Sequence, residues 1–94
     1  MEAITKMDLE ELRKEIDKID DEIISNLSRR KNLIEKVAKI KKESNMPVLD
    51  EEREQQLLQR LKEKSKENRL DEDFVISLYK IILENSRKEQ EDNK

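Results

Sequence analysis

Apolar residues recur at helical spacing in three stretches of the chain. The first stripe runs from Leu9 to Ile40, the second centres on Leu57–Leu61, and the third includes Leu78 and Ile82. Because residues three or four apart share one face of a helix, this spacing predicts three amphipathic helices. The chain has no glycine and one proline, and nothing in it has the alternation of a strand. The predicted fold class is therefore all-α.

Capping residues and the single proline mark the helix ends. The predicted helices run from about Leu9 to about Ser44, from Asp50 to about Asn68, and from Asp71 to about Lys88. The expected N-caps are Asp8, with Thr5 as an alternative earlier start, and then Asp50 and Asp71. Pro47 ends the first helix. Residues 1–94 form one predicted domain, with residues 1–7 and 89–94 expected to fray.

Polar residues interrupt each apolar stripe at positions that should face the core. Asn26 and Arg30 interrupt the first stripe. Asp50, Arg53 and Glu54 precede the second stripe on its own face, and Ser86 and Gln90 continue the third at fourfold spacing. Burying a charge is costly unless it is paired. The pattern therefore favours an internal polar site lined with cations and amides.

The first predicted helix is too long for its own chain to cover. About 36 residues at 1.5 Å each give a helix of about 54 Å. Two shorter helices cannot bury a seam of that length. A plain coiled-coil dimer would bury the seam but would leave the other two helices unused. We therefore expect a homodimeric helical bundle that uses all three helices of each chain.

Composition excludes several classes of function. Charged residues make up 48% of the 94 residues, but the net charge is only −3, so no basic field favours nucleic acid or an anionic membrane. Phe74 and Tyr79 are the only aromatic residues, too few to stack bases. No apolar run is long enough for a membrane span or a signal peptide. We expect a cytoplasmic protein that binds neither nucleic acid nor membrane.

The missing residue types narrow the chemistry further. The chain has neither cysteine nor histidine, which removes thiol chemistry, disulfides, the commonest general base and the commonest metal ligand. Three aspartates, Asp17, Asp20 and Asp21, lie close together in the sequence, but acids on a charged helix face are usually solvated. We predict no metal site.

The spacing of the cations suggests a site shared between chains. Arg30 and Lys41 are eleven residues apart, about 20° around the helix axis and roughly 16 Å along it. Both side chains can therefore reach one small anion. Arg13 lies about 25 Å from Arg30 and about 100° around the axis, too far to reach the same ligand. An antiparallel partner helix would bring Arg13 to it.

Several segments together resemble a known family. In chain order they are Leu12–Asp17, Ser28–Arg30, Val37–Lys41, Pro47–Glu54 and Ile81–Ser86. In order and spacing they resemble the all-helical chorismate mutases over nearly the full chain. The resemblance implies an intertwined homodimer of three-helix subunits with two equivalent sites. It also implies the rearrangement of chorismate to prephenate, on the route to phenylalanine and tyrosine.

The resemblance also assigns catalytic and carboxylate-binding residues. Lys41 and Gln90 match the family's two donors to the ether oxygen of the substrate, and Lys41 also contacts a carboxylate. Arg30 matches the carboxylate-binding arginine of the same subunit. Arg13 matches the arginine that reaches across from the partner chain, and Ser86 matches another contact on the carboxylate side.

Three further residues match the family around the substrate hydroxyl. Asp50 and Glu54 match its contacts, and Arg53 matches a neighbouring basic residue. Taken alone, Asp50 is explained as an N-cap, and Arg53 and Glu54 as ordinary charges of a first turn. Asn26 departs from the family, which usually has an aliphatic residue there, and Lys31 is unusually polar.

The implied reaction suits this set of residues. The rearrangement is concerted and unimolecular, so it requires no nucleophile, metal or cofactor. Catalysis can come from holding the folded conformer of the substrate and from donors aimed at charge growing on the ether oxygen. One alternative is an isochorismate pyruvate-lyase on the same fold, which needs similar anion-binding groups. Another is a non-catalytic helical regulatory module.

Overall fold

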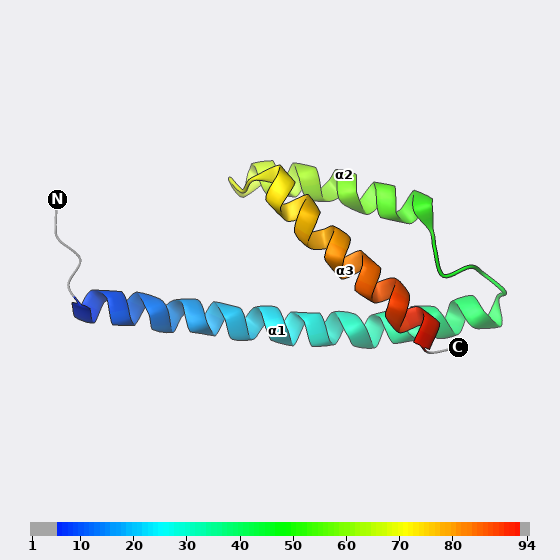
Figure 1. The fold of residues 1–94 in the computed structure, drawn as a ribbon, viewed down its shortest axis with the longest axis horizontal. Coiled ribbons are helices and arrows are strands. Elements are labelled where there is room, and N and C mark those ends of the chain that lie inside the picture. The colour runs from blue at the N-terminus through cyan, green and yellow to red at the C-terminus, as the bar shows by residue number, and fades with distance from the viewer. Residues whose placement is uncertain (1–5, 93–94) are drawn as a thin grey trace. The chain divides into compact units, whose positions relative to one another are not determined.

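The computed structural model describes residues 6–92, and the regular structure within this range is entirely α-helical (Figure 1). The elements are α1 (Lys6–Glu43), α2 (Glu51–Glu67) and α3 (Glu72–Asp92). The prediction of an all-α chain with one very long helix is confirmed. Contacts divide the chain into two compact units, residues 1–32 and residues 33–94, and α1 contributes to both. Within the described range, none of the helices is both long and apolar enough to span a membrane.

The start of α1 differs from the prediction. The helix begins at Lys6, so Asp8 lies in its first turn and the prediction of Asp8 as the N-cap is wrong. In that position its carboxylate still interacts favourably with the positive end of the helix dipole. Fraying was expected of residues 1–7, but Lys6 and Met7 belong to the helix. The alternative start at Thr5 and the fraying expected of residues 1–5 lie outside the described residues.

A reversal of the backbone at Asn45 ends α1 close to the predicted residue. Asn45 has a φ of 56°, a left-handed conformation that asparagine tolerates better than most residues. The Met46 amide donates to the Lys41 carbonyl over 2.7 Å, and the Asn45 amide donates to the Lys42 carbonyl over 3.3 Å. These two bonds form a Schellman motif and satisfy carbonyls that would otherwise lack partners. Pro47 follows, where the helix could not continue.

The start of α2 confirms the predicted cap. Asp50 has non-helical backbone angles, and its Oδ1 accepts a hydrogen bond of 3.0 Å from the Arg53 amide. The helix ends near the predicted Asn68 in a second Schellman motif, in which the Leu70 amide donates to the Ser65 carbonyl over 2.8 Å. Arg69 takes the left-handed position of this motif, with a φ of 58°.

Helix α3 starts as predicted but ends later. The Asp71 carboxylate accepts from the Asp73 amide over 3.1 Å, as expected of an N-cap. The prediction that the helix stops near Lys88 and that residues 89–92 fray is wrong, because α3 continues to Asp92. Gln90 is only 6% exposed and its side chain is hydrogen-bonded, which holds the last turns in place. Residues 93–94 lie outside the described range.

The core of the unit formed by residues 33–94 lies between α2 and α3, which pack against each other. The chain reverses direction between these helices (Figure 1). Leu57, Leu61 and Leu83 are buried at the contact, with Leu58, Val75, Ile76 and Tyr79 packed around them. Burying a leucine side chain contributes about 1.5–3 kcal/mol. Ser65 is also buried there, and its hydroxyl donates to the Leu61 carbonyl over 2.7 Å, so this buried hydroxyl has a hydrogen-bond partner.

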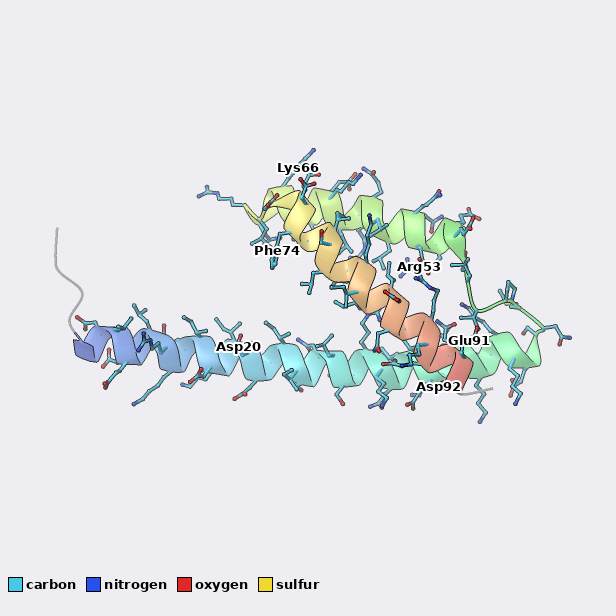
Figure 2. All side chains as sticks on the ribbon, in the orientation of Figure 1. Asp20, Arg53, Lys66, Phe74, Glu91 and Asp92 are labelled. Atoms are coloured by element: carbon cyan, nitrogen blue, oxygen red, sulfur yellow. The ribbon has the colours of Figure 1, made fainter. Side chains whose placement is uncertain are left out.

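In the unit formed by residues 1–32, the apolar stripe of α1 is exposed. The described part of this unit is one stretch of helix, and side chains project all along it (Figure 2). The exposed apolar residues of this stretch are Leu9, Leu12, Ile16, Ile19, Ile23, Ile24 and Leu27. A single helix has no second element against which to bury its own stripe.

Candidate functional site

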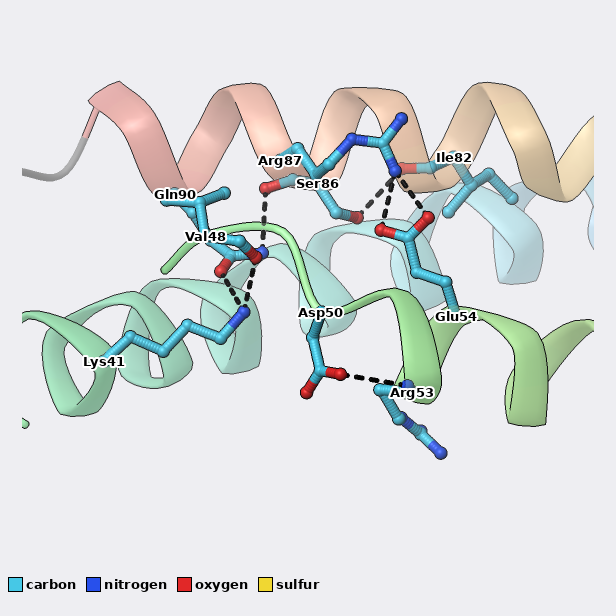
Figure 3. A network of polar contacts seen from close by, with 9 residues as sticks. All are labelled: Lys41, Val48, Asp50, Arg53, Glu54, Ile82, Ser86, Arg87 and Gln90. Carbon is cyan, nitrogen blue, oxygen red and sulfur yellow. Dashed lines mark hydrogen bonds and ion pairs between the residues drawn. The ribbon is translucent and has the colours of Figure 1, made fainter. Parts of the chain in front are cut away.

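A polar cluster joins the end of α1, the following loop and the last turns of α3 (Figure 3). The Lys41 ammonium donates to Gln90 Oε1 over 2.8 Å and to the Val48 carbonyl over 2.6 Å. Both acceptors are neutral oxygens, so these bonds hold the ammonium in place without cancelling its charge. Because a lysine can only donate, Gln90 must turn its oxygen toward Lys41 and leave its NH2 group as a donor. The structure thus brings the two predicted catalytic donors into direct contact.

Local backbone geometry explains how these three residues meet. Lys41 lies in the last turn of α1, and the reversal at Asn45 carries the chain back so that Val48 lies over the Lys41 side chain. Gln90 is one turn beyond Ser86 on the buried face of α3. The Ser86 hydroxyl donates to the Ile82 carbonyl over 2.9 Å, and Gln90 Nε2 lies 3.4 Å from the Ser86 carbonyl.

Open cavities lie beside this cluster. One, of about 450 Å³, is lined by Ala38, Lys41, Lys42, Asn45, Met46, Pro47, Val48 and Gln90. Another, of about 600 Å³, lies along Met46, Pro47, Leu49, Asp50 and Glu51. These volumes fall within the usual range for small-molecule sites. Lys41, Lys42 and an amide on the first cavity suit a small organic anion.

Asp50 and Arg53 lie at the start of α2. Asp50 is partly buried and uses Oδ1 for the cap, which leaves Oδ2 to accept another hydrogen bond. The Arg53 side chain is exposed and points away from Lys41 and Gln90 (Figure 3). The structure brings the backbone of Arg53 to Asp50 but does not bring its guanidinium into the cluster.

Glu54 is held by an arginine that the sequence analysis missed. Arg87 Nη1 lies 2.6 Å from both carboxylate oxygens of Glu54, and both side chains are partly buried. Arg87 follows Ser86 directly and lies three residues before Gln90, so its position beside two predicted site residues was a usable signal. The pairing itself joins residues 33 positions apart, which helical spacing cannot reveal.

The remaining two predicted site residues, Arg13 and Arg30, belong to the unit formed by residues 1–32. Arg13 is exposed, and Arg30 is partly buried. The convergence of Arg30 and Lys41 on one anion stays a prediction, as does the contribution of Arg13 to a partner's site. The other six predicted residues lie in the unit formed by residues 33–94.

Comparison with known proteins identifies the family. The family model for chorismate mutase type II matches residues 12–91, which include all eight predicted site residues. The chain belongs to the chorismate mutase type II family. The resemblance inferred from the sequence is therefore confirmed, and with it an enzymatic function.

Individual relatives agree with this family. A chorismate mutase of Methanocaldococcus jannaschii is 35% identical over 79 residues, which cover 84% of this chain and 80% of the relative. A bifunctional chorismate mutase/prephenate dehydratase of Buchnera aphidicola is 38% identical over 82 residues, covering 87% of this chain but 21% of the relative. The Escherichia coli protein of the same name is 36% identical over 75 residues, covering 80% and 19%. The chain thus spans about a fifth of the bifunctional relatives.

Proposed function

We propose that the protein converts chorismate to prephenate, on the route to phenylalanine and tyrosine, in two equivalent sites shared between the chains of a homodimer. Membership of the family supports the reaction. The observation that carries the proposed site is the contact between Lys41 and Gln90, two hydrogen-bond donors placed together at a cavity.

The rearrangement breaks the ether C–O bond of chorismate while a new C–C bond forms, so no atom is gained or lost. Negative charge grows on the ether oxygen as the C–O bond breaks. An ammonium has three hydrogens. Two hydrogens of the Lys41 ammonium are used in the bonds to Val48 and Gln90, which leaves one for the ether oxygen. Removing a donor of this kind typically costs about 10²–10³ in kcat.

Gln90 is the second donor to the same oxygen. Its carbonyl accepts from Lys41, and one hydrogen of its NH2 group is directed at the Ser86 carbonyl over 3.4 Å, which leaves the other as the donor. Gln90 is buried and tied to Lys41, so the direction of this donor is set before substrate arrives. Such preorganisation avoids a reorganisation cost during the reaction.

The two carboxylates of the substrate require cations. Arg30 and, from the partner chain, Arg13 suit this role because a guanidinium can bind a carboxylate through two parallel hydrogen bonds. The positive charge of Lys41 attracts the same carboxylates. Ser86 contacts one of them if its hydroxyl turns away from the Ile82 carbonyl, and the exposed Arg53 side chain would have to turn toward the site. Holding both carboxylates keeps the substrate folded in its reactive conformer.

The substrate hydroxyl has acceptors at the start of α2. Asp50 is the N-cap of α2, and Glu54 lies four residues further along, where it pairs with Arg87. Each keeps lone pairs for a substrate hydroxyl, since a carboxylate can accept about four hydrogen bonds. Asp50 Oδ2 is not used by the cap of α2.

The exposed stripe of α1 supports the homodimer. Seven apolar residues between Leu9 and Leu27 are exposed, and the stripe continues through Leu33, Val37 and Ile40. A seam of this length suits a second copy of the same helix, since paired long helices bury matching stripes on both chains. An antiparallel pairing would also bring Arg13 to the partner's site.

The direct test is the incubation of the protein with chorismate and, in a parallel reaction, with isochorismate, followed by identification of the products. We expect one prephenate for each chorismate consumed, with kcat reduced at least about 10²-fold in Lys41→Ala. Release of pyruvate from isochorismate without prephenate formation would instead show a lyase. An unchanged substrate pool would show a non-catalytic module.

A further inference from the structure

Two acidic side chains lie where the proposed site has to bind a dianion. Asp50 is the N-cap of α2 and Glu54 lies in its first turn, and each is partly buried. Ionised carboxylates in such a position repel the carboxylates of chorismate. A site of this composition therefore requires compensating positive charge close to each acid.

The Asp50 carboxylate is compensated by its own helix. It accepts a hydrogen bond from the Arg53 amide and lies at the positive end of the α2 dipole. Glu54 is a full turn further along, where the dipole contributes less. Its compensation comes from Arg87, whose Nη1 lies 2.6 Å from Oε1 and 2.6 Å from Oε2.

The environment of this pair makes it stronger than an ordinary surface ion pair. The side chains of Arg87 and Glu54 are 33% and 23% exposed, against 57% and 62% for the Lys64–Glu67 pair further along α2. Partial burial reduces screening by water and salt. Because one nitrogen contacts both oxygens, the contact fixes the direction in which the carboxylate points, while each oxygen keeps a lone pair for another donor.

We propose that Arg87 is a positioning residue that neutralises and orients Glu54 so that a dianionic substrate can bind beside it. This inference rests on the proposed function. Arg87 lies between Ser86 and Gln90 in the sequence but acts through Glu54 and not on the reacting atoms. Repulsion from an unpaired Glu54 would act equally on substrate and transition state, because both carry the same two carboxylates. The effect should therefore fall on KM and leave kcat nearly unchanged.

The experiment measures kcat and KM for chorismate over a range of salt concentrations. In Arg87→Met we expect KM to rise by at least about tenfold, with kcat within about twofold of the wild type. The ratio of the two KM values should shrink as salt rises, since salt screens the repulsion. Arg87→Lys keeps the charge and should keep KM within about threefold of the wild type.

Two further variants separate charge from packing. Arg87→Gln can still hydrogen-bond to Glu54 but carries no charge, so its KM should rise as in Arg87→Met. Glu54→Gln combined with Arg87→Met removes both charges, and its KM should be lower than that of Arg87→Met alone. Lys64→Met makes the same change of charge at the Lys64–Glu67 pair and should leave KM unchanged.

The outcomes distinguish this inference from the proposed function. If the wild type turns over chorismate and Arg87→Met and Arg87→Gln have the wild-type KM, the role of Arg87 is overturned and the proposed function stands. A double variant no better than Arg87→Met would also overturn it, because the unpaired carboxylate would then not be the cause. Absence of wild-type turnover would overturn the proposed function, and the inference with it.

Discussion

The two units of this chain carry similar apolar stripes with opposite outcomes. In residues 33–94, Leu57 on α2 is 6% exposed because α3 packs over it. In residues 1–32, Ile16 on α1 is 54% exposed although its stripe is at least as regular. An amphipathic pattern therefore indicates which face of a helix is apolar. Whether that face is buried depends on which other elements can pack against it. We expect a second chain to supply the missing element for residues 1–32.

The largest effect is expected from a charge placed in the apolar stripe of residues 1–32. Ile16→Glu would bury an unpaired carboxylate in the proposed dimer seam, which is strongly unfavourable. We expect loss of the dimer and a fall of at least about 10²-fold in activity. Sedimentation and turnover at the same protein concentration measure both effects.

Lys18→Glu is the control for that experiment, because Lys18 is an exposed residue of the same helix outside the stripe. It should leave assembly nearly unchanged. A folded wild-type monomer at micromolar concentration would contradict the dimer, as would a melting temperature that does not depend on protein concentration.

Mixing two inactive variants tests whether residues 1–32 complete a site on another chain. Arg13→Ala and Arg30→Ala should each lose at least about 10²-fold in activity as homodimers. In a heterodimer of the two variants, one of the two sites contains both arginines. Random exchange of an equal mixture makes half of the dimers mixed, so activity should recover to about a quarter of the wild type. No recovery after verified exchange would rule out action of Arg13 across the interface.

The third prediction concerns the polar cluster of residues 33–94. In Gln90→Glu the carboxyl can donate to the ether oxygen only while it is protonated, and once ionised it repels the growing negative charge. Activity should therefore be retained at acidic pH and should fall at least about tenfold as pH rises through the pKa of that carboxyl. The ordinary pKa of glutamate is about 4.3. The measurement is kcat/KM against pH.

The wild type is the reference for that profile. A neutral amide donates at any ordinary pH, so wild-type activity should not fall across the neutral range. Parallel profiles for the two proteins would mean that Gln90 does not donate to the reacting oxygen and that Lys41 acts without it.

A smaller effect is expected from the polar interruption in the seam. Asn26 is exposed in the single chain, where its Oδ1 lies 3.4 Å from Arg29 Nη1. If a second chain covers this position, Asn26→Leu replaces a buried amide by an aliphatic side chain and should stabilise the dimer by about 1 kcal/mol. Thermal unfolding at several concentrations measures the change. An unchanged midpoint would show that Asn26 stays in contact with solvent in the assembled protein.

The smallest expected effect lies at the turn after α2. Arg69 adopts a left-handed backbone conformation, which costs a residue with a Cβ atom about 1 kcal/mol relative to glycine. Arg69→Gly should therefore raise the free energy of unfolding by up to about 1 kcal/mol without changing kcat/KM. Arg69→Ala is the control, because it removes the same side chain and keeps the strain. Equal stability of the two variants would locate the effect in the side chain.

Local features of the sequence determined the secondary structure. Helical spacing predicted all three helices, and the caps at Asp50 and Asp71 were predicted correctly because a cap depends on only three or four neighbouring residues. Two helix ends were misplaced. The start at Lys6 precedes the expected cap, and the end of α3 depends on the burial of Gln90 by residues far away in sequence.

Only the tertiary structure decided the pairing of the site residues. The spacing of Arg30 and Lys41 indicated an anion site, and the family resemblance named Gln90, yet the contact of Gln90 with Lys41 joins positions 49 residues apart. Glu54 was named as well, whereas its partner Arg87 was missed for the same reason. Periodicity reports which face of a helix a residue occupies and carries no information about the residue opposite. That information lies in how α2 and α3 pack and in how the loop after α1 reverses, because the packing of helices, and not their propensity, sets distances between residues remote in sequence.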